Sequence, residues 1–166
     1  MKAVNPLLRY LLQGPIALLI ISTCIITGAQ AEEVQLNMTQ AKSGNLYVHA
    51  TLQSAYANTD TDLLLDTGAS YVALTRATFE RLNGEAESSF SRYIFGAMAN
   101  GKVEKIPLYL LAELKLAENC VLNNIEVAVF PKADKDILGL NALSRMQPFT
   151  MQFAPALLTS NHCASS

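Results

Sequence analysis

Charged residues are scarce in this chain, and tryptophan is absent. Of its 166 residues, 16% are charged, below the roughly 25% that is usual for globular domains. The net charge is −2 and no segment makes a basic stripe, which argues against a nucleic-acid binder. Neither His49 nor His162 has metal-ligand spacing to a cysteine, so we predict no metal site. By contrast, 51% of the residues are hydrophobic, which is too many for a disordered chain, and the length suits one domain.

Part of the charge deficit lies in the N-terminal segment, which has the composition of a targeting signal. Lys2 and Arg9 make its start basic. Residues 15–26 form an apolar run that is shorter than the roughly 20 residues of a spanning helix. Ala29 and Ala31 then make the small-x-small pattern that a signal peptidase cleaves, so we predict cleavage after Ala31.

Two alternatives to a cleaved signal stay open at this point. Residues 7–29 could serve as an uncleaved membrane anchor, and Cys24 could carry a lipid. Every version places the rest of the chain outside the cytosol, in the periplasm or at the outer face of the inner membrane. We therefore predict three parts: residues 1–31 as signal peptide or anchor, 32–153 as the folded domain, and 154–166 as a loose C-terminal tail.

The folded part is dominated by short segments in which apolar and polar residues alternate, the pattern of half-buried β-strands. Residues 108–117 are good helix formers, yet every second one is apolar, so a strand is predicted there too. Gly44-Asn45 and Asn100-Gly101 predict hairpin turns, and Thr75 can cap a short helix that runs through Phe79 and Leu82 and ends near Asn83-Gly84. The other predicted strands are 34–38, 46–52, 63–65, 71–75, 90–98, 121–130, 137–139 and 149–153, with a second short helix over 141–146.

Two cysteines, Cys120 and Cys163, remain after the leader. In an oxidising compartment they could form a disulfide that ties down the tail. Unpaired thiols, or a bridge between two chains, are the open alternatives.

The clearest chemical motif is Asp66-Thr67-Gly68, directly after the apolar residues 63–65. A carboxylate at the end of a buried strand is costly unless it is hydrogen-bonded or paired. Alone, the tripeptide is also a common turn in which the Asp side chain caps its own backbone. A functional role for Asp66-Thr67-Gly68 is favoured because the chain holds a second motif, Ile137-Leu138-Gly139, which leads into the predicted helix over 141–146.

Together the two motifs resemble those of the retroviral-type aspartic proteases, the retropepsins, and more closely those of their bacterial single-domain relatives. The resemblance extends over residues 34–153. It implies a mostly β, single-domain acid-protease fold, a closed barrel-like structure with one or two short helices, acting as a homodimer. It further implies an aspartic endopeptidase that hydrolyses peptide or protein substrates and needs no cofactor.

An aspartic protease needs two facing carboxylates that share one proton and activate a water. This chain has a single Asp-Thr-Gly, so the catalytic Asp66 would need Asp66 of a second copy as its partner. The resemblance also assigns supporting roles. These fall to Thr67, Gly68, Ala69 and Ser70 in the active-site loop, to Met98, Ala99, Asn100, Gly101 and Lys102 in a flap over the substrate, and to Ile137, Leu138 and Gly139 behind the loop.

Other acidic residues lack such a setting. Asp60, Asp62, Asp134 and Asp136 lie in polar stretches and are expected to be solvated. Leu140 departs from the retroviral pattern, which has an arginine there that helps to hold the dimer, and the flap lacks the retroviral glycine-rich tip.

Two functions compete with an active protease. A catalytically silent protease-like module could dimerise or bind peptide strands. An unrelated secreted β-domain could serve in the cell envelope.

Overall fold

The computed structural model describes residues 33–82, 89–97 and 101–164. All described residues belong to one compact unit, Ala31–Ser166. Within them the helices are α1 (Arg76–Arg81), α2 (Leu140–Leu143) and the 3-10 turn η3 (Ser144–Met146). The strands are β1 (Val34–Gln40), β2 (Leu46–Gln53), β3 (Asn58–Leu65), β4 (Val72–Thr75), β5 (Phe90–Ala97), β6 (Val103–Ala117), β7 (Cys120–Phe130), β8 (Asp136–Leu138), β9 (Phe149–Phe153) and β10 (Ala156–Ser160).

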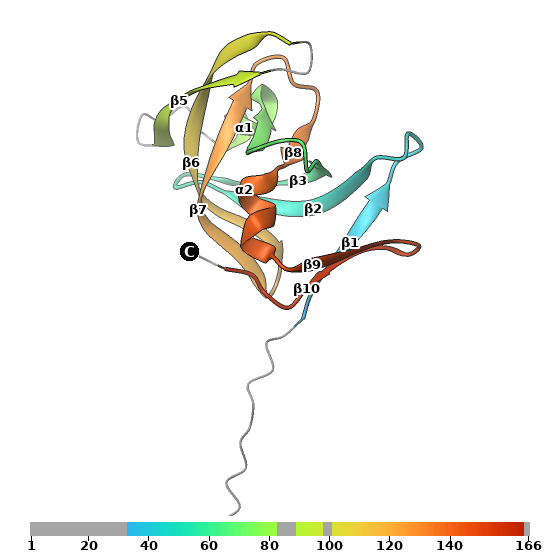
Figure 1. Ribbon diagram of the computed structural model, residues 1–166. Helices are drawn as coiled ribbons and strands as arrows, with labels where there is room; N and C mark the ends of the chain where they lie inside the picture. Colours follow the sequence, from blue (N-terminus) through green and yellow to red (C-terminus); the bar gives the residue numbers. More distant parts are fainter. Residues whose placement is uncertain (1–32, 83–88, 98–100, 165–166) are drawn as a thin grey trace, which may run out of the picture. The chain divides into compact units, whose positions relative to one another are not determined.

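Six of the described strands close into a barrel (Figure 1). Neighbours run in the order β6, β7, β4, β8, β3 and β2, and β2 then pairs with β6, with Leu52 opposite Leu114. Two of these pairings are parallel, β3 with β8 and β4 with β7. The parallel β3–β8 pair places Leu65 beside Leu138, so the segments that follow both strands begin at the same edge of the barrel.

The predicted β-strand over residues 108–117 is confirmed, although these residues favour helices. Leu108 and Leu114 are fully buried within β6, and each such side chain stabilises the fold by roughly 2 kcal/mol. The predicted helix after Thr75 is confirmed as α1, and the Thr75 side chain accepts a hydrogen bond from the Thr78 N–H. The mostly β fold with two short helices is therefore as predicted.

The prediction of a loose tail is wrong for Ala156–Ser160. These residues form β10, which pairs with β1 on one side and with β9 on the other. Leu158 lies opposite Leu36, and both are buried. The physical reason is the β1 strand from the other end of the domain, which supplies a long-range partner and a buried place for this short apolar run.

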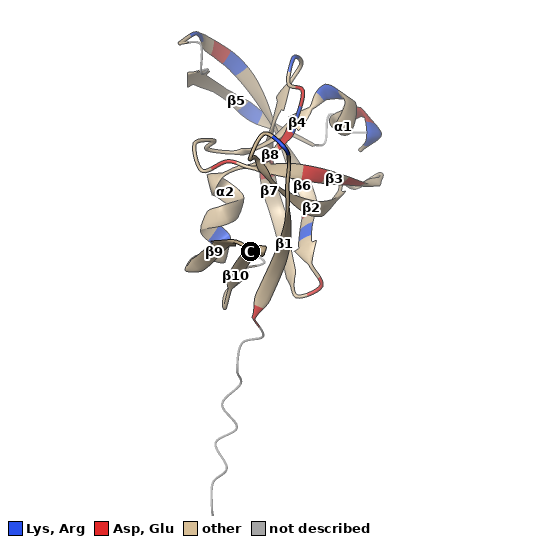
Figure 2. Cartoon of the chain, turned by 90° about the vertical axis from the view of Figure 1, so that its right-hand side faces the viewer, with Lys and Arg blue, Asp and Glu red and all other residues tan. Residues whose placement is uncertain are grey.

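Figure 2 marks the positions of the charged residues along the backbone, and among the described residues Asp136 is the one charged residue that is buried. Asp60 and Asp62 lie within β3 and are exposed, so the prediction that they are solvated is confirmed. Among the described ranges, no helix combines the length and the apolar character that crossing a membrane would require.

Candidate active site

Asp66 opens a tight turn at the end of β3. Its backbone N–H donates to the Leu138 carbonyl at 3.1 Å, which continues the parallel pairing beyond the strand. The Gly68 N–H donates to Asp66 Oδ1 at 2.8 Å, and the Ala69 N–H donates to the Asp66 carbonyl at 3.3 Å. One carboxylate oxygen is thus fixed by the turn, and the half-buried side chain remains open toward solvent.

The segment after β8 supports this turn from behind. The Leu140 N–H donates to the Ala69 carbonyl at 2.8 Å, and the Asn141 N–H donates to the Ser70 carbonyl at 3.1 Å. An added Cβ at Gly139 would overlap the Tyr71 carbonyl oxygen and lie 2.9 Å from that of Ala69. Only a residue without a side chain allows the two segments to approach so closely. Ile137, Leu138 and Gly139 therefore lie where a supporting role for them requires.

Asn141 is a structural residue of the site that the sequence did not single out. Its Oδ1 accepts a hydrogen bond from the Val72 N–H at 2.7 Å, and its Nδ2 donates to the Glu126 carbonyl at 2.8 Å. The side chain thereby joins the start of β4 to β7. An asparagine two residues after the Ile-Leu-Gly glycine is the one sequence signal, and it does not reveal partners on two other strands.

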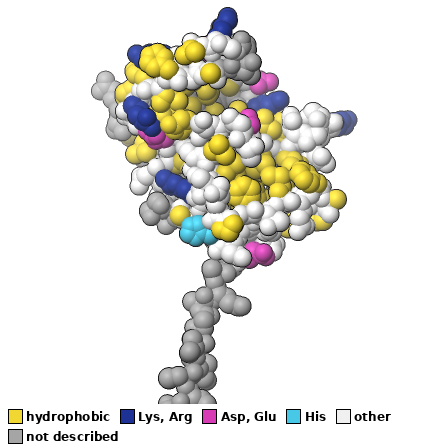
Figure 3. Space-filling view, in the orientation of Figure 1, with side chains coloured by type: hydrophobic (Ala, Val, Ile, Leu, Met, Phe, Trp, Pro, Cys, Tyr) yellow, Lys and Arg dark blue, Asp and Glu magenta, His cyan; other side chains and the backbone are white. Residues whose placement is uncertain are grey.

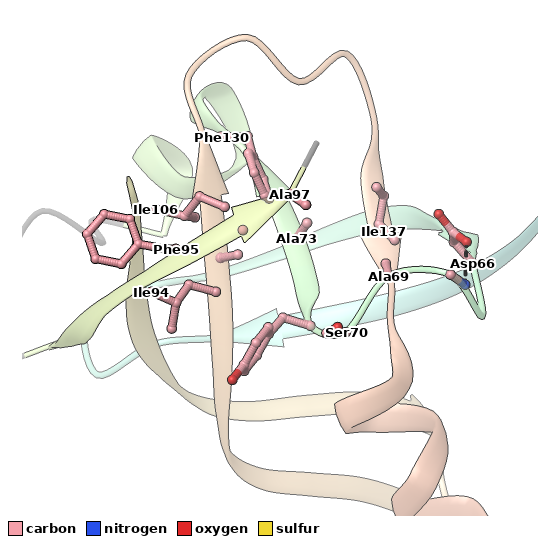
Figure 4. A pocket seen from close by; sticks show the side chains of 14 residues that line it. Asp66, Ala69, Ser70, Ala73, Ile94, Phe95, Ala97, Ile106, Phe130 and Ile137 are labelled. Carbon is pink, nitrogen blue, oxygen red and sulfur yellow. Dashed lines mark hydrogen bonds between the residues drawn. The ribbon is translucent and has the colours of Figure 1, made fainter. Parts of the chain in front are cut away.

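A cleft of about 680 Å³ lies next to the turn. In the space-filling view, hydrophobic side chains gather beneath the hairpin of β5 and β6 (Figure 3). The close-up places Asp66 at one end, with Ala69 and Ile137 near it and Ile94, Ile106 and Phe130 farther along (Figure 4). Among the described residues that line the cleft, Asp66 is the one acidic residue. The arrangement suits an extended peptide with apolar side chains next to a carboxylate.

The flap predicted around residues 98–102 corresponds to the connection between β5 and β6. The two strands pair antiparallel up to Ala97 opposite Val103. Met98, Ala99 and Asn100 lie outside the described residues. Gly101 has a left-handed φ of 78°, as a hairpin turn requires, and both it and Lys102 are exposed.

An ion pair lies beside the cleft, at the base of this hairpin. Arg92 on β5 donates from Nη2 to Glu126 Oε2 at 2.6 Å and from Nε to Glu126 Oε1 at 2.9 Å. The Arg92 Nη2 also donates to the Tyr71 hydroxyl at 3.3 Å. The hydrogen bond from Arg92 lowers the pKa of Glu126, against the opposing effect of desolvation, and the hydrogen bond to Glu126 raises the pKa of Arg92.

Asp136 is not solvated, which corrects the prediction made for it. The residue is 5% exposed. Its Oδ2 accepts from the Thr61 and Thr78 hydroxyls, each at 2.6 Å, and its Oδ1 accepts from the Thr75 N–H at 2.7 Å. These donors on β3 and around the start of α1 replace water, so the carboxylate fixes β8 between them. The neighbouring Asp134 is exposed, as expected.

A disulfide joins Cys120, at the start of β7, to Cys163, three residues after β10. Cys120 is fully buried, so the bond attaches the end of the described chain to the barrel. In the same described ranges, no group of three or more His, Cys, Asp or Glu side chains converges on a point where a metal could bind. His49 instead pairs with Asp62 at 3.0 Å on the exposed face of β2 and β3.

Two comparisons with known proteins both match aspartic proteases. A family model described as gag-polyprotein putative aspartyl protease matches residues 52–145. The chain is also similar to the crystal structure of a retropepsin-like aspartic protease from Rickettsia conorii, with a TM-score of 0.57 and 24% sequence identity. That match covers 77% of this chain and 98% of the other, and it confirms the predicted fold class. No curated protein matches the sequence.

Proposed function

The chain belongs to the gag-polyprotein putative aspartyl protease family, within the retropepsin-like aspartic proteases, and from that membership we propose that it is an aspartic endopeptidase. The observation that carries the proposal is the place of Asp66. Its carboxylate lies at the end of an apolar cleft, in a turn that a Gly68 N–H and the segment after β8 hold in position. A carboxylate so placed is available to a water and to a peptide carbonyl.

The catalytic unit would be a symmetric homodimer. One carboxylate cannot both take a proton from the attacking water and donate a hydrogen bond to the scissile carbonyl. Asp66 is the one acid among the described residues of the cleft, so its partner is Asp66 of a second copy. Two carboxylates about 3 Å apart cannot both ionise cheaply and therefore share one proton.

The reaction follows from this shared proton. The ionised Asp66 takes a proton from a water, which attacks the carbonyl carbon of the peptide bond. The protonated Asp66 of the other copy donates a hydrogen bond to the carbonyl oxygen. The C–N bond then breaks as a proton passes from the dyad to the departing amine, which leaves the two carboxylates sharing one proton again. No covalent acyl-enzyme forms, because the nucleophile is water. The turn contributes by fixing Oδ1 through the Gly68 N–H, which sets the direction of the carboxylate.

A peptide-library assay tests the proposal. The purified full chain is incubated with mixed peptides from about pH 4 to about pH 7, and the products are identified by mass spectrometry. We expect cleavage that a statine-type transition-state mimic inhibits and that Asp66→Asn abolishes.

The matched control is Asp134→Asn, the same substitution at an exposed acid outside the cleft. It should leave the cleavage rate unchanged. Cleavage that persists in Asp66→Asn would refute the proposal. The absence of cleavage from a wild-type protein that sedimentation shows to be dimeric would favour the silent peptide-binding module.

We also propose that the protein is exported, with residues 1–31 as a cleaved signal or residues 7–29 as a membrane anchor. The Cys120–Cys163 disulfide supports this, because disulfides persist in oxidising compartments such as the periplasm. Cell fractionation with N-terminal sequencing is the test. A periplasmic protein that begins at Glu32 fits cleavage, a membrane-bound one with an intact N-terminus fits the anchor, and a cytosolic one refutes export.

A further inference from the structure

We infer that Arg92 and Glu126 form a clasp that positions the β5–β6 hairpin over the cleft, with Tyr71 and Asn141 joining the clasp to the active-site loop. The expected effect of the clasp on peptide cleavage rests on the proposed function. The expected effect of the clasp on the position of the hairpin does not depend on that function. Arg92 and Glu126 are positioning residues, and neither is among the residues that line the cleft.

The clasp begins at an irregularity in β5. Phe90 lies opposite Tyr109 and Arg92 lies opposite Leu108, so Ser91 is an extra residue in the pairing. Successive residues of a regular strand point to opposite faces, and a bulge changes that direction locally. Here the Ser91 hydroxyl donates to Glu126 Oε1 at 2.8 Å, and Arg92 Nε donates to the same oxygen at 2.9 Å.

The bulge sets which residues of β5 face the small apolar cluster under the hairpin. Ile94 packs on this cluster, which contains Ala73 and Ile106. The next residue, Phe95, also borders the cleft, but its ring points away from Asp66 and is 76% exposed (Figure 4). A slip of one residue would exchange the two faces. Because Ser91 and Arg92 both donate to the Glu126 carboxylate, Glu126 determines which face of β5 each of the following residues takes. Gly96 fits the same arrangement, because an added Cβ there would lie 2.6 Å from Ile106 Cδ1.

A chain of contacts leads from the clasp to the active-site loop. Arg92 donates to the Tyr71 hydroxyl, and the Tyr71 ring packs on the small apolar cluster that contains Ala73 and Ile106. From the other side, Asn141 binds the Glu126 carbonyl and the Val72 N–H. The base of the hairpin, β7 and the residues after the Asp66 turn are thereby held in one network, in which Arg92 joins β5 to β7 and to Tyr71.

Hydrogen exchange tests the clasp without any need for activity. Arg92→Gln removes the charge and the forked donor, and Arg92→Lys keeps the charge alone. We expect amide exchange in residues 90–97 to become about tenfold faster in Arg92→Gln and to rise less in Arg92→Lys. The matched control is Lys115→Gln, which removes an exposed ion pair with Glu118 at 2.7 Å, at the other end of β6.

Kinetics test the effect on the reaction. With a cleaved peptide, Arg92→Gln should raise KM about threefold to tenfold and change kcat by less than about twofold, because the hairpin binds substrate and does not carry the chemistry. Glu126→Gln should do the same, and the double variant should be no worse than either single one, since both remove one interaction.

The possible outcomes distinguish a failure of the clasp from a failure of the proposed protease function. Exchange and KM in Arg92→Gln equal to those of Lys115→Gln would overturn the clasp. So would exchange that rises equally across the barrel with a lower melting temperature, because that is a general loss of stability. If a wild type that sedimentation shows to be dimeric cleaves no peptide while exchange rises only in the hairpin, the proposed function fails and the clasp stands.

Discussion

A Cβ atom at Gly139 would overlap the carbonyl oxygen of Tyr71, so β8 and the active-site loop can meet only through a glycine. We predict that Gly139→Ala pushes the two segments apart and lowers the free energy of unfolding by about 1–3 kcal/mol. It should also lose most activity, because the Ala69 and Ser70 carbonyls that bind the Leu140 and Asn141 N–H groups follow directly on Asp66-Thr67-Gly68. Urea unfolding and kcat measure the two effects.

Gly44→Ala is the comparison for this prediction. Gly44 has a φ of 87°, and an added Cβ there contacts nothing within 4 Å. Its cost is therefore the left-handed backbone alone, about 1 kcal/mol, and activity should be kept. If both variants lost stability but neither lost activity, the close approach at Gly139 would not serve the active site.

Asp136→Asn should destabilise the domain, although it changes no residue of the cleft. The carboxylate accepts from the Thr75 N–H and from two threonine hydroxyls, and an amide presents only one acceptor oxygen. We expect a loss of about 1–3 kcal/mol in the free energy of unfolding, measured in urea. Asp134→Asn, at an exposed position, should change it by less than about 0.5 kcal/mol. Equal losses in the free energy of unfolding from the two variants would contradict a stabilising role for the buried Asp136 carboxylate.

Reduction of the disulfide should loosen the end of the domain. The Cys120–Cys163 bond spans a sequence separation of 43, and loop-closure entropy predicts a stabilisation of about 4 kcal/mol. Cys163→Ser should therefore unfold at lower urea than the oxidised wild type. Dithiothreitol should lower the wild-type midpoint toward that of the variant and leave the variant itself unchanged. A wild-type midpoint that does not respond to complete reduction would contradict this.

Patterns along the chain predicted most of the strands, since alternation is local and survives in the folded sheet. The Asp-Thr-Gly and Ile-Leu-Gly motifs could also be identified from the sequence. In the structure they lie side by side because β3 and β8 form a parallel pair. Asp136 was misassigned because its donors Thr61 and Thr78 lie 75 and 58 residues away. In its own neighbourhood it is a polar residue beside a lysine.

β10 was missed for a related reason. Ala156–Ser160 follow Pro155 and are short, and their partner β1 lies at the far end of the domain. Asn141 and Arg92 show the same limit at the candidate site. Each binds residues on other strands, and a local pattern carries no information about such partners.

The contribution of the clasp to stability should depend on pH in a defined direction. The hydrogen bond from Arg92 lowers the pKa of Glu126 in the folded protein below its unfolded value, which is about 4.3. The stabilisation from this pair is therefore fully present above the unfolded pKa of Glu126. It is lost as the pH falls through the lower pKa that Glu126 has in the folded protein. The difference in urea midpoint between wild type and Glu126→Gln should be constant from about pH 7 to about pH 5 and shrink below about pH 4. A difference that grows on acidification would reverse the assigned sign.

Subunit mixing distinguishes a shared active site from one that each chain completes alone. If each copy contributes one Asp66, a dimer with a single Asp66→Asn subunit lacks half of the dyad and should be inactive. Wild type equilibrated with a threefold excess of Asp66→Asn should then keep about a quarter of its activity, the fraction of its subunits that still pair with each other. Adding the same excess of Asp134→Asn should instead raise total activity, because that variant retains the dyad. A wild-type rate that is unaffected by excess Asp66→Asn would mean that a single chain holds both catalytic groups.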